Sequence, residues 1–153
     1  MRKTTVLFAT QMGASQELAG RAADDLESAG IEAFDVNMAD FSIDDLKSEE
    51  DLFVIASTWG DGDPPDECED FFHALKESAP LHLENVRFCV LALGDTSYEM
   101  FCQFGKNLDE ELERHGAQRI LDRVDCDLDE QEQYPIWIEK IQTLVKNEMA
   151  AKS

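Results

Sequence analysis

Short apolar runs alternate with amphipathic stretches along the whole chain. Three runs are almost continuously apolar, as in parallel strands buried on both faces: Thr4 to Ala9, Leu52 to Ala56 and Phe88 to Leu93. Two further segments, Ile31 to Val36 and Gln118 to Val124, alternate apolar with polar residues, which is typical of the outer strands of a sheet. The pattern therefore predicts five strands.

Helices are predicted between and after these strands. The first has an apolar stripe from Leu18 to Ala29 and ends at Gly30, and the second spans Asp66 to Glu77. The third spans Phe101 to His115 and ends at Gly116. The last contains Trp137, Ile138, Ile141, Leu144 and Val145, with Pro135 expected in its first turn. The acidic stretch from Phe41 to Glu50 holds at most a short helix.

This alternation predicts a three-layer, doubly wound α/β domain. Strand–helix–strand units close right-handedly into a parallel sheet that is covered on both faces. We expect one domain over residues 1–153, with five strands in the order 2-1-3-4-5. In such sheets ligands bind outside the carboxyl ends of the strands, so the loops after strands one, three and four should contain the site.

Charge and composition exclude several classes of function. The 13 Lys and Arg residues against 34 Asp and Glu residues give a net charge of −21, which excludes a generic nucleic-acid binder and disfavours docking on anionic lipid. No apolar run approaches the roughly 20 residues that span a bilayer, and the first run is too short for a signal peptide.

The cysteines and histidines predict no metal site and no nucleophilic triad. The four cysteines have neither a CxxC spacing nor a neighbouring histidine, so a disulfide framework and a zinc site are disfavoured and a reducing cytoplasm is expected. The three histidines, His73, His82 and His115, have no sequence partners and are expected on the surface.

The first loop combines hydroxyl groups, a glycine and a helix N-terminus. Thr10, Gln11, Met12, Gly13, Ala14 and Ser15 connect a strand to a helix and include no Lys or Arg. Such a loop can hold a phosphate through backbone N–H groups and hydroxyls. It is neither a P-loop nor a GxGxxG dinucleotide motif. The alternative is that Thr10 and Ser15 only cap the helix.

The other two loops each present one aromatic side chain. One contains Ser57, Thr58, Trp59, Gly60, Asp61 and Gly62, and the other runs from Leu93 through Tyr98 to Cys102. Two aromatics at one sheet edge could hold a planar ring between them, although Trp59 could instead be a surface residue over a helix end. A phosphate site beside a slot for a flat ring fits flavin mononucleotide (FMN).

Together the three loops resemble the flavodoxin-like FMN-binding domains of diflavin reductases. The resemblance is closest to the FMN domain of the sulfite reductase flavoprotein and extends to stand-alone short flavodoxins related to MioC. It covers essentially the whole chain and is strongest over Ser57 to Pro65 and over Leu93 to Asp127.

The resemblance implies a role for each loop. Residues Thr10 to Ser15 would hold the phosphate, Trp59 and Tyr98 would stack on the two faces of the ring, and Gly60 would turn a carbonyl toward the flavin N5. The ring and ribityl chain would be lined by the third loop: Leu93, Gly94, Asp95, Thr96, Ser97, Tyr98, Phe101 and Cys102. Asp127 and Leu128 would close the third side.

Two departures from the family pattern concern this site. Met12 stands where the family usually has threonine, and Ala14 replaces a common polar residue, which predicts weaker phosphate binding. Trp59 stands where tyrosine, glutamine or histidine often occurs, which affects the redox potentials more than the affinity.

The acidic residues around these loops predict a low reduction potential. A carboxylate about 10 Å from the ring, at an effective dielectric constant of about 40, opposes one extra negative charge by roughly 0.8 kcal/mol, which is on the order of 35 mV. We expect a monomeric carrier that takes single electrons from an FAD/NADPH-type reductase to a metal-centred acceptor protein, docking through an acidic rim. The alternative is that the charge of −21 is a solvated surface suited to high salt.

The sequence disfavours two other functions and leaves a third open. A response-regulator receiver domain needs acidic residues where Thr10, Gln11, Ser57 and Thr58 stand. A self-contained flavin-dependent reductase would need a nicotinamide site, which nothing in the sequence indicates. An FMN domain or stand-alone subunit of a sulfite-reductase-type NADPH diflavin system stays open; 153 residues are too few for an FAD–NADPH module as well.

Overall fold

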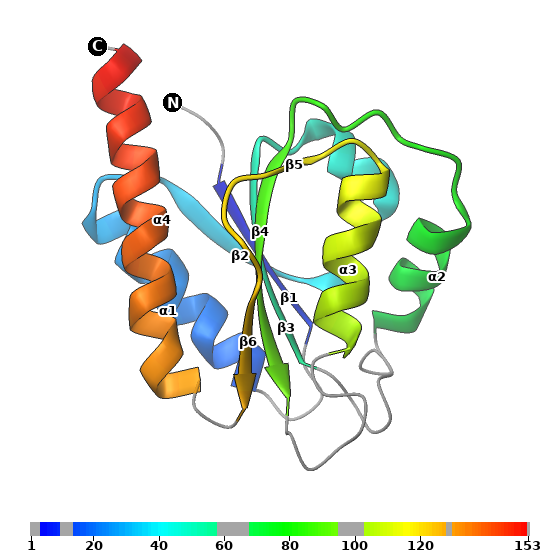
Figure 1. Ribbon diagram of the computed structural model, residues 1–153, viewed down its shortest axis with the longest axis horizontal. Coiled ribbons are helices and arrows are strands. Elements are labelled where there is room, and N and C mark those ends of the chain that lie inside the picture. The colour runs from blue at the N-terminus through cyan, green and yellow to red at the C-terminus, as the bar shows by residue number, and fades with distance from the viewer. Residues whose placement is uncertain (1–3, 10–13, 58–67, 95–102, 128–129, 153) are drawn as a thin grey trace.

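Six parallel strands form one sheet with helices on both faces (Figure 1). The computed structural model describes residues 4–9, 14–57, 68–94, 103–127 and 130–152. The strands are β1 (Thr4–Ala9), β2 (Ala33–Asn37), β3 (Asp51–Ser57), β4 (Arg87–Gly94), β5 (Gln118–Arg119) and β6 (Val124–Asp127). The helices are α1 (Ala14–Ser28), α2 (Glu69–Glu77), α3 (Gln103–Arg114) and α4 (Glu130–Lys152), with two short 3₁₀ helices, η1 (Met38–Asp40) and η2 (Ile43–Ser48).

The strand order is β2-β1-β3-β4-β5, and β6 also pairs with β4. Every strand pairing among the described residues is parallel. The doubly wound α/β fold and the order 2-1-3-4-5 are thereby confirmed.

The predicted outer strand Gln118 to Val124 is wrong as one continuous element. The structure has two shorter strands on the same side of β4, with Arg119 opposite Phe88 and Val124 opposite Leu91. The chain therefore uses five steps where β4 uses three, and the two extra residues interrupt the ladder. Strict apolar–polar alternation fails within this segment, at Ile120-Leu121 and at Asp122-Arg123, which is where the ladder is interrupted.

Two helix ends agree with the sequence and one helix start does not. Gly30 and Gly116 have φ angles of +86° and +95°, the left-handed conformation that ends α1 and α3 as predicted. Helix α4 begins at Glu130, so Pro135 lies in its second turn instead of its first. Pro135 lies beyond the first four N–H groups, so its missing N–H removes one i→i−4 hydrogen bond, and the helix nevertheless continues through this residue.

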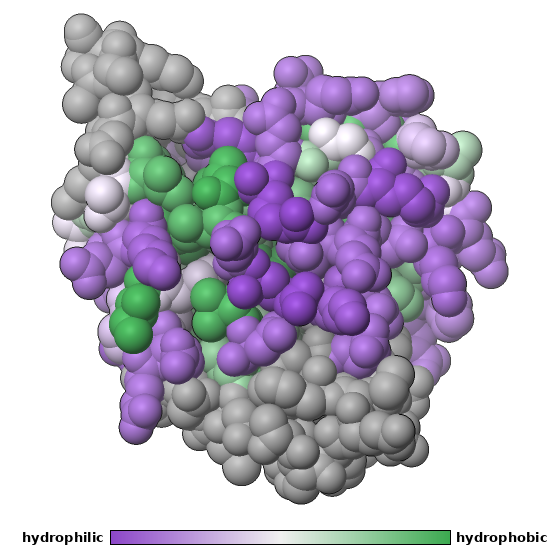
Figure 2. Space-filling view, viewed as in Figure 1, coloured by the Kyte–Doolittle hydropathy of each residue, from purple (hydrophilic) through white to green (hydrophobic). Residues whose placement is uncertain are grey.

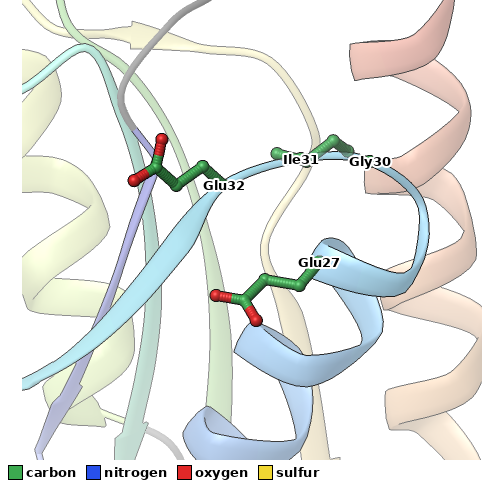
Figure 3. A pocket seen from close by; sticks show the side chains of 4 residues that line it. All are labelled: Glu27, Gly30, Ile31 and Glu32. Carbon is green, nitrogen blue, oxygen red and sulfur yellow. The ribbon is translucent and has the colours of Figure 1, made fainter.

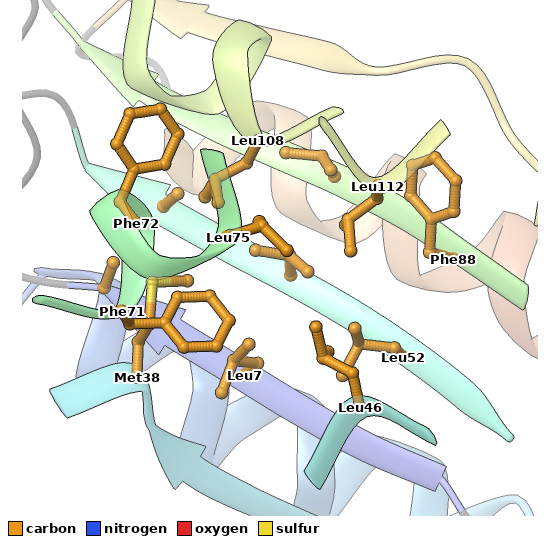
Figure 4. Packing of buried hydrophobic residues seen from close by; sticks show 14 of the residues in the cluster. Leu7, Met38, Leu46, Leu52, Phe71, Phe72, Leu75, Phe88, Leu108 and Leu112 are labelled. Atoms are coloured by element: carbon orange, nitrogen blue, oxygen red, sulfur yellow. The ribbon is translucent and has the colours of Figure 1, made fainter. Parts of the chain in front are cut away.

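Two apolar clusters flank the sheet. Under α2 and α3, Phe71, Leu75, Leu108 and Leu112 pack on Leu52, Val54 and Phe88 of the sheet (Figure 4). Under α1 and α4, Leu18, Leu26, Trp137 and Ile141 pack on Val6, Phe8, Phe53 and Ile55. The alternation of side chains along β1 and β3 supplies both clusters, which is why these strands are almost uniformly apolar.

His115 is fully buried, so its predicted surface position is wrong; His73 and His82 are exposed as expected. Its Nδ1 accepts a hydrogen bond from the Leu81 N–H at 3.0 Å, and its Nε2 lies 2.8 Å from the Leu75 carbonyl oxygen. The ring is therefore the neutral tautomer that donates from Nε2. These partners lie 34 and 40 residues away in sequence, beyond the reach of a local pattern.

At the amino ends of the strands, Asp51 and Arg87 form a buried ion pair. The Arg87 Nε and Nη2 donate to the two Asp51 carboxylate oxygens at 2.8 and 2.9 Å, and the Asp51 side chain is 1% exposed. The start of β1 and the end of α4 lie toward this amino edge of the sheet (Figure 1). Among the described residues, no helix has the length and apolar character that crossing a membrane would require.

Candidate functional site

Four strand ends meet at the carboxyl edge of the sheet, opposite the Asp51–Arg87 pair. The register places Ala9 beside Ala56, Ser57 beside Leu93, and Gly94 beside Asp127. Residues from four distant parts of the sequence are thus brought to one edge. This is where ligands bind in doubly wound sheets.

Six of the predicted site residues fall within the described residues. Ala14 and Ser15 are the first residues of α1, Ser57 ends β3, Leu93 and Gly94 end β4, and Asp127 ends β6. The side chain of Leu93 is buried in the apolar cluster under α1 and α4, so what it offers a ligand is backbone. The other predicted residues lie outside the described residues: Thr10, Gln11, Met12, Gly13, Thr58, Trp59, Gly60, Asp61, Gly62, Asp95, Thr96, Ser97, Tyr98, Phe101, Cys102 and Leu128. The stacking of Trp59 and Tyr98 stays a prediction.

The N-terminus of α1 opens on this edge. The helix begins at Ala14, five residues after β1 ends at Ala9, so its first backbone N–H groups face the carboxyl ends of the strands. Unpaired N–H groups and the helix dipole form a receptor for a phosphate monoester that needs no cationic side chain. The backbone N–H groups at the start of α1 fit the phosphate of FMN in their chemistry, and the part played by the hydroxyls of Thr10 and Ser15 stays a prediction.

Charged side chains at this end of the described elements are mostly acidic. Glu17 lies in the first turn of α1, Asp40 follows β2, and Glu69 and Asp70 lie in the first turn of α2. Lys106 lies in the first turn of α3 and is exposed. The local field therefore opposes additional negative charge at the carboxyl edge.

The cysteines of the described part are buried thiols without disulfides. Cys68, Cys89 and Cys126 are free and buried. Burial, with the nearby carboxylates of Asp51 and Asp109 adding to it, raises the pKa of Cys89 well above its ordinary value. Among the described residues, no group of His, Cys, Asp and Glu side chains is arranged to hold a metal ion.

Two surface hollows lie away from the carboxyl edge. One, of about 360 Å³, is formed where α1 turns into β2 and is lined by Glu27, Gly30, Ile31 and Glu32 (Figure 3). The other, of about 450 Å³, lies along α4 and includes Leu121, Ile136 and Leu144, where apolar surface gathers (Figure 2). Neither hollow contains a residue that the sequence predicted for the site.

The sequence also missed a cluster of charged residues between α3 and the outer strands. Asp109 of α3 is 4% exposed and accepts two hydrogen bonds from Arg119, from Nε at 3.0 Å and from Nη2 at 2.7 Å. Arg119 also contacts Glu113, and Arg123 lies 3.6 Å from the same Asp109 carboxylate. A buried aspartate on a helix that is otherwise rich in exposed acids gives no sequence signal of its own.

Comparison with known proteins gives a consistent result. The family described as Flavodoxin matches residues 6–136. The sulfite reductase [NADPH] flavoprotein alpha-component of Bacillus subtilis (strain 168) is 44% identical over 140 residues, which is 92% of this chain and 23% of that protein. Its counterpart from Neisseria meningitidis serogroup B is 40% identical over 146 residues, 95% of this chain and 24% of that protein. The chain thus spans about a quarter of the length of the curated relatives it matches.

Solved structures agree with the fold. A cysteine variant of flavodoxin from Pseudomonas aeruginosa superposes with a TM-score of 0.81 at 26% identity, covering 94% of this chain and 99% of that one. The flavodoxin of Streptococcus pneumonia TIGR4 superposes with a TM-score of 0.78 at 28% identity and covers 99% of both chains.

Proposed function

Because this chain belongs to the flavodoxin family, it is an FMN-binding electron carrier, and we propose that it passes electrons singly from an FAD/NADPH-type reductase to a metal-centred acceptor protein. The observation that supports this best is the match to the family over residues 6–136, which includes the whole carboxyl edge of the sheet. When bound, FMN supplies the redox chemistry by accepting and releasing electrons one at a time. The chain supplies binding, orientation and the electrostatic field.

We assign FMN to the carboxyl edge. The N-terminus of α1, with Thr10 to Ser15, would hold the phosphate, and Trp59 and Tyr98 would stack on the ring. Segments 57–62, 93–102 and 127–128 would form the walls. The support is that the strands leading into these segments all end at the same edge, at Ala9, Ser57, Gly94 and Asp127. Residues 1–153 would then form one monomeric FMN domain.

The proposed donor follows from the relatives. The matching curated proteins are NADPH sulfite reductase flavoproteins, of which this chain corresponds to about a quarter. A chain of this kind needs electrons from a reductase, either a separate protein or another part of an NADPH diflavin system. The name of these relatives, the alpha-component of a sulfite reductase, supports delivery of electrons to a further component, and we propose that this acceptor has a metal centre.

The acidic groups near the edge would serve the carrier in two ways. Each carboxylate within about 10 Å of the ring opposes reduction to a more negative form by on the order of 35 mV before screening by salt. Glu17, Asp40, Glu69 and Asp70 would together form an acidic rim that steers a basic partner toward the flavin.

A redox titration tests this function. The purified protein is loaded with FMN and its visible spectrum is followed during reductive titration; we expect two one-electron steps, the second at low potential. Protein that stays colourless after addition of FMN would contradict the cofactor assignment. A single two-electron step would contradict one-electron transfer.

A second assay separates a carrier from a self-contained reductase. With NADPH as the only reductant, the FMN-loaded protein should stay oxidised until an FAD-containing reductase is added. Rapid reduction by NADPH alone would refute the need for a donor protein. A reduction rate through the added reductase that does not change between low and high salt would refute the steering role of the acidic rim.

A further inference from the structure

The outer side of the sheet is interrupted between β5 and β6, immediately before the strand that leads into the proposed wall 127–128. Strand β5 pairs with β4 at Arg87 and Phe88, and β6 pairs with β4 from Leu91 to Gly94. The two extra residues between them leave the connection 120–123 outside the ladder. What lies around this connection therefore helps to set the position of β6, which ends at Asp127.

One buried carboxylate joins both sides of the interruption to helix α3. Asp109 binds Arg119, at the end of β5, through two hydrogen bonds of 3.0 and 2.7 Å. It also lies 3.6 Å from Nη1 of Arg123, the residue immediately before β6. The Arg123 Nε in turn donates to Asp125 within β6 at 2.7 Å. Asp109 is thus linked to the residues that flank the connection and, through Arg123, to β6 itself.

Further contacts hold this arrangement rigid. The Arg119 guanidinium lies 5.6 Å from the Phe88 ring centroid, and its Nη2 lies 2.5 Å from Glu113 Oε2. The Ile120 N–H donates to the Phe88 carbonyl at 3.0 Å, which is the last ladder bond before the connection departs. The Asp109 side chain is 6% exposed, so water competes little for these bonds.

We propose that Asp109 is a positioning residue for FMN binding: it fixes the carboxyl end of β6 beside Gly94, and with it the segment that begins at Asp127. This inference rests on the proposed function. Helix α3 follows the 95–102 segment, and β6 precedes 128–129, so one carboxylate connects the elements on which two of the proposed walls depend. Asp109 itself need not touch the flavin.

The chain offers a matched control. Asp51 is a second buried carboxylate that accepts two hydrogen bonds from an arginine, but it lies at the amino edge of the same sheet. Asp51→Asn and Asp109→Asn each remove one negative charge from a buried ion pair. Both should lower the free energy of unfolding, whereas only Asp109→Asn should change FMN binding.

The experiment measures the dissociation constant of FMN by fluorescence quenching, together with the visible circular dichroism of the bound flavin. Both are recorded without denaturant, under conditions in which each variant is folded. We expect Asp109→Asn to weaken FMN binding about 5- to 20-fold and to change the flavin dichroism, and Asp51→Asn to stay within twofold of the unmodified protein.

The loss of charge in Asp109→Asn would by itself change the FMN affinity in the opposite direction. Removing a negative charge should tighten the binding of an anionic phosphate, so weaker binding by Asp109→Asn reports geometry. Arg123→Gln is the second variant, because it releases β6 while leaving the Asp109–Arg119 pair intact. Since loss of its positive charge by itself weakens phosphate binding, the change in flavin dichroism decides the question if Asp109→Asn does not fold. We expect a 3- to 10-fold weaker affinity with the same change in flavin dichroism.

Three results would overturn the inference. If Asp109→Asn and Arg123→Gln bind FMN within twofold of the unmodified protein, the cluster only stabilises the fold. If Asp51→Asn weakens binding equally, the effect is a general loosening of the sheet. If the unmodified protein does not bind FMN, both this inference and the proposed function fail, so the two failures are distinguishable.

Discussion

Gly105 of α3 lies so close to β4 that a methyl group cannot be added without moving the helix. A Cβ at this position would lie 2.3 Å from the Ala92 Cβ and 3.2 Å from the Ala92 Cα. Because carbon atoms in contact are about 3.5–4.0 Å apart, Gly105→Ala requires α3 and β4 to separate locally by at least about 1.2 Å. Ala92 is two residues before the end of β4 at Gly94, so the displacement would reach the carboxyl edge.

The change in the free energy of unfolding caused by Gly105→Ala can be estimated from two opposing terms. Overpacking a core typically costs about 1–3 kcal/mol, and alanine in place of glycine returns about 1 kcal/mol of helix propensity. The contact is severe and includes backbone, so we expect a net loss of about 1–2 kcal/mol. With a urea m-value of about 2 kcal/mol/M, the unfolding midpoint should fall by about 0.5–1 M.

Gly20 of α1 is the matched control, since a Cβ there would meet nothing closer than the Asp35 carboxylate at 4.0 Å. Gly20→Ala should therefore stabilise the protein by about 0.5–1 kcal/mol. Urea unfolding of the FMN-free protein, followed by far-ultraviolet circular dichroism, measures both. If Gly105→Ala proves as stable as Gly20→Ala, the close approach of α3 to β4 at Gly105 would be contradicted. We also expect Gly105→Ala, and not Gly20→Ala, to bind FMN more weakly.

Three further predictions concern single residues. His82 is exposed and has a φ of +58°, so His82→Gly should raise the free energy of unfolding by about 0.5 kcal/mol by relieving left-handed strain. His73→Gly in α2 should lower it by about 1 kcal/mol, and equal urea midpoints of the two variants would contradict this. His115→Phe should cost about 1–3 kcal/mol because it removes a fully buried ring that accepts from the Leu81 N–H and donates to the buried Leu75 carbonyl. His73→Gln should change stability by less than about 0.5 kcal/mol. Burial raises the pKa values of Cys89 and Tyr134, and for Tyr134 the neighbouring Asp25 adds to this, so both groups stay protonated in the folded protein when they ionise in the unfolded chain. Their contribution to the free energy of unfolding should therefore be complete below about pH 8.5 and decline as the pH rises through about 9 for Cys89 and about 10 for Tyr134. Cys89→Ala should flatten the decline near about pH 9, and Tyr134→Phe the decline near about pH 10. An unchanged pH profile in both variants would refute the assignment of these declines to the two residues.

Much of the fold could be predicted because its signals are local. The apolar runs of β1, β3 and β4 follow from burial on both faces, and Gly30 and Gly116 end their helices because glycine tolerates a positive φ. The features that were missed depend on partners distant in sequence. The interruption between β5 and β6 is associated with Asp109 of α3, and the burial of His115 is set by groups at Leu75 and Leu81.

The candidate site could be located from the sequence to the level of loops. Parallel strand order alone brings the segments after β1, β3 and β4 together, and the structure places their flanking residues at one edge. The pairing of Gly94 with Asp127 brings the third side to the same edge, whereas the contacts of Arg123 with Asp109 and Asp125, next to β6, could not be predicted from the local sequence.

The placement of the chain ends has a practical consequence for electrochemistry. The start of β1 and the end of α4 lie toward the amino edge, at the opposite end of the strands from Gly94 and Asp127 (Figure 1). If FMN binds at the carboxyl edge as proposed, a tag attached beyond either of these elements would tether the protein to an electrode or a bead with the flavin facing outward. Immobilised molecules would then exchange electrons with soluble proteins more readily than with the support beneath them.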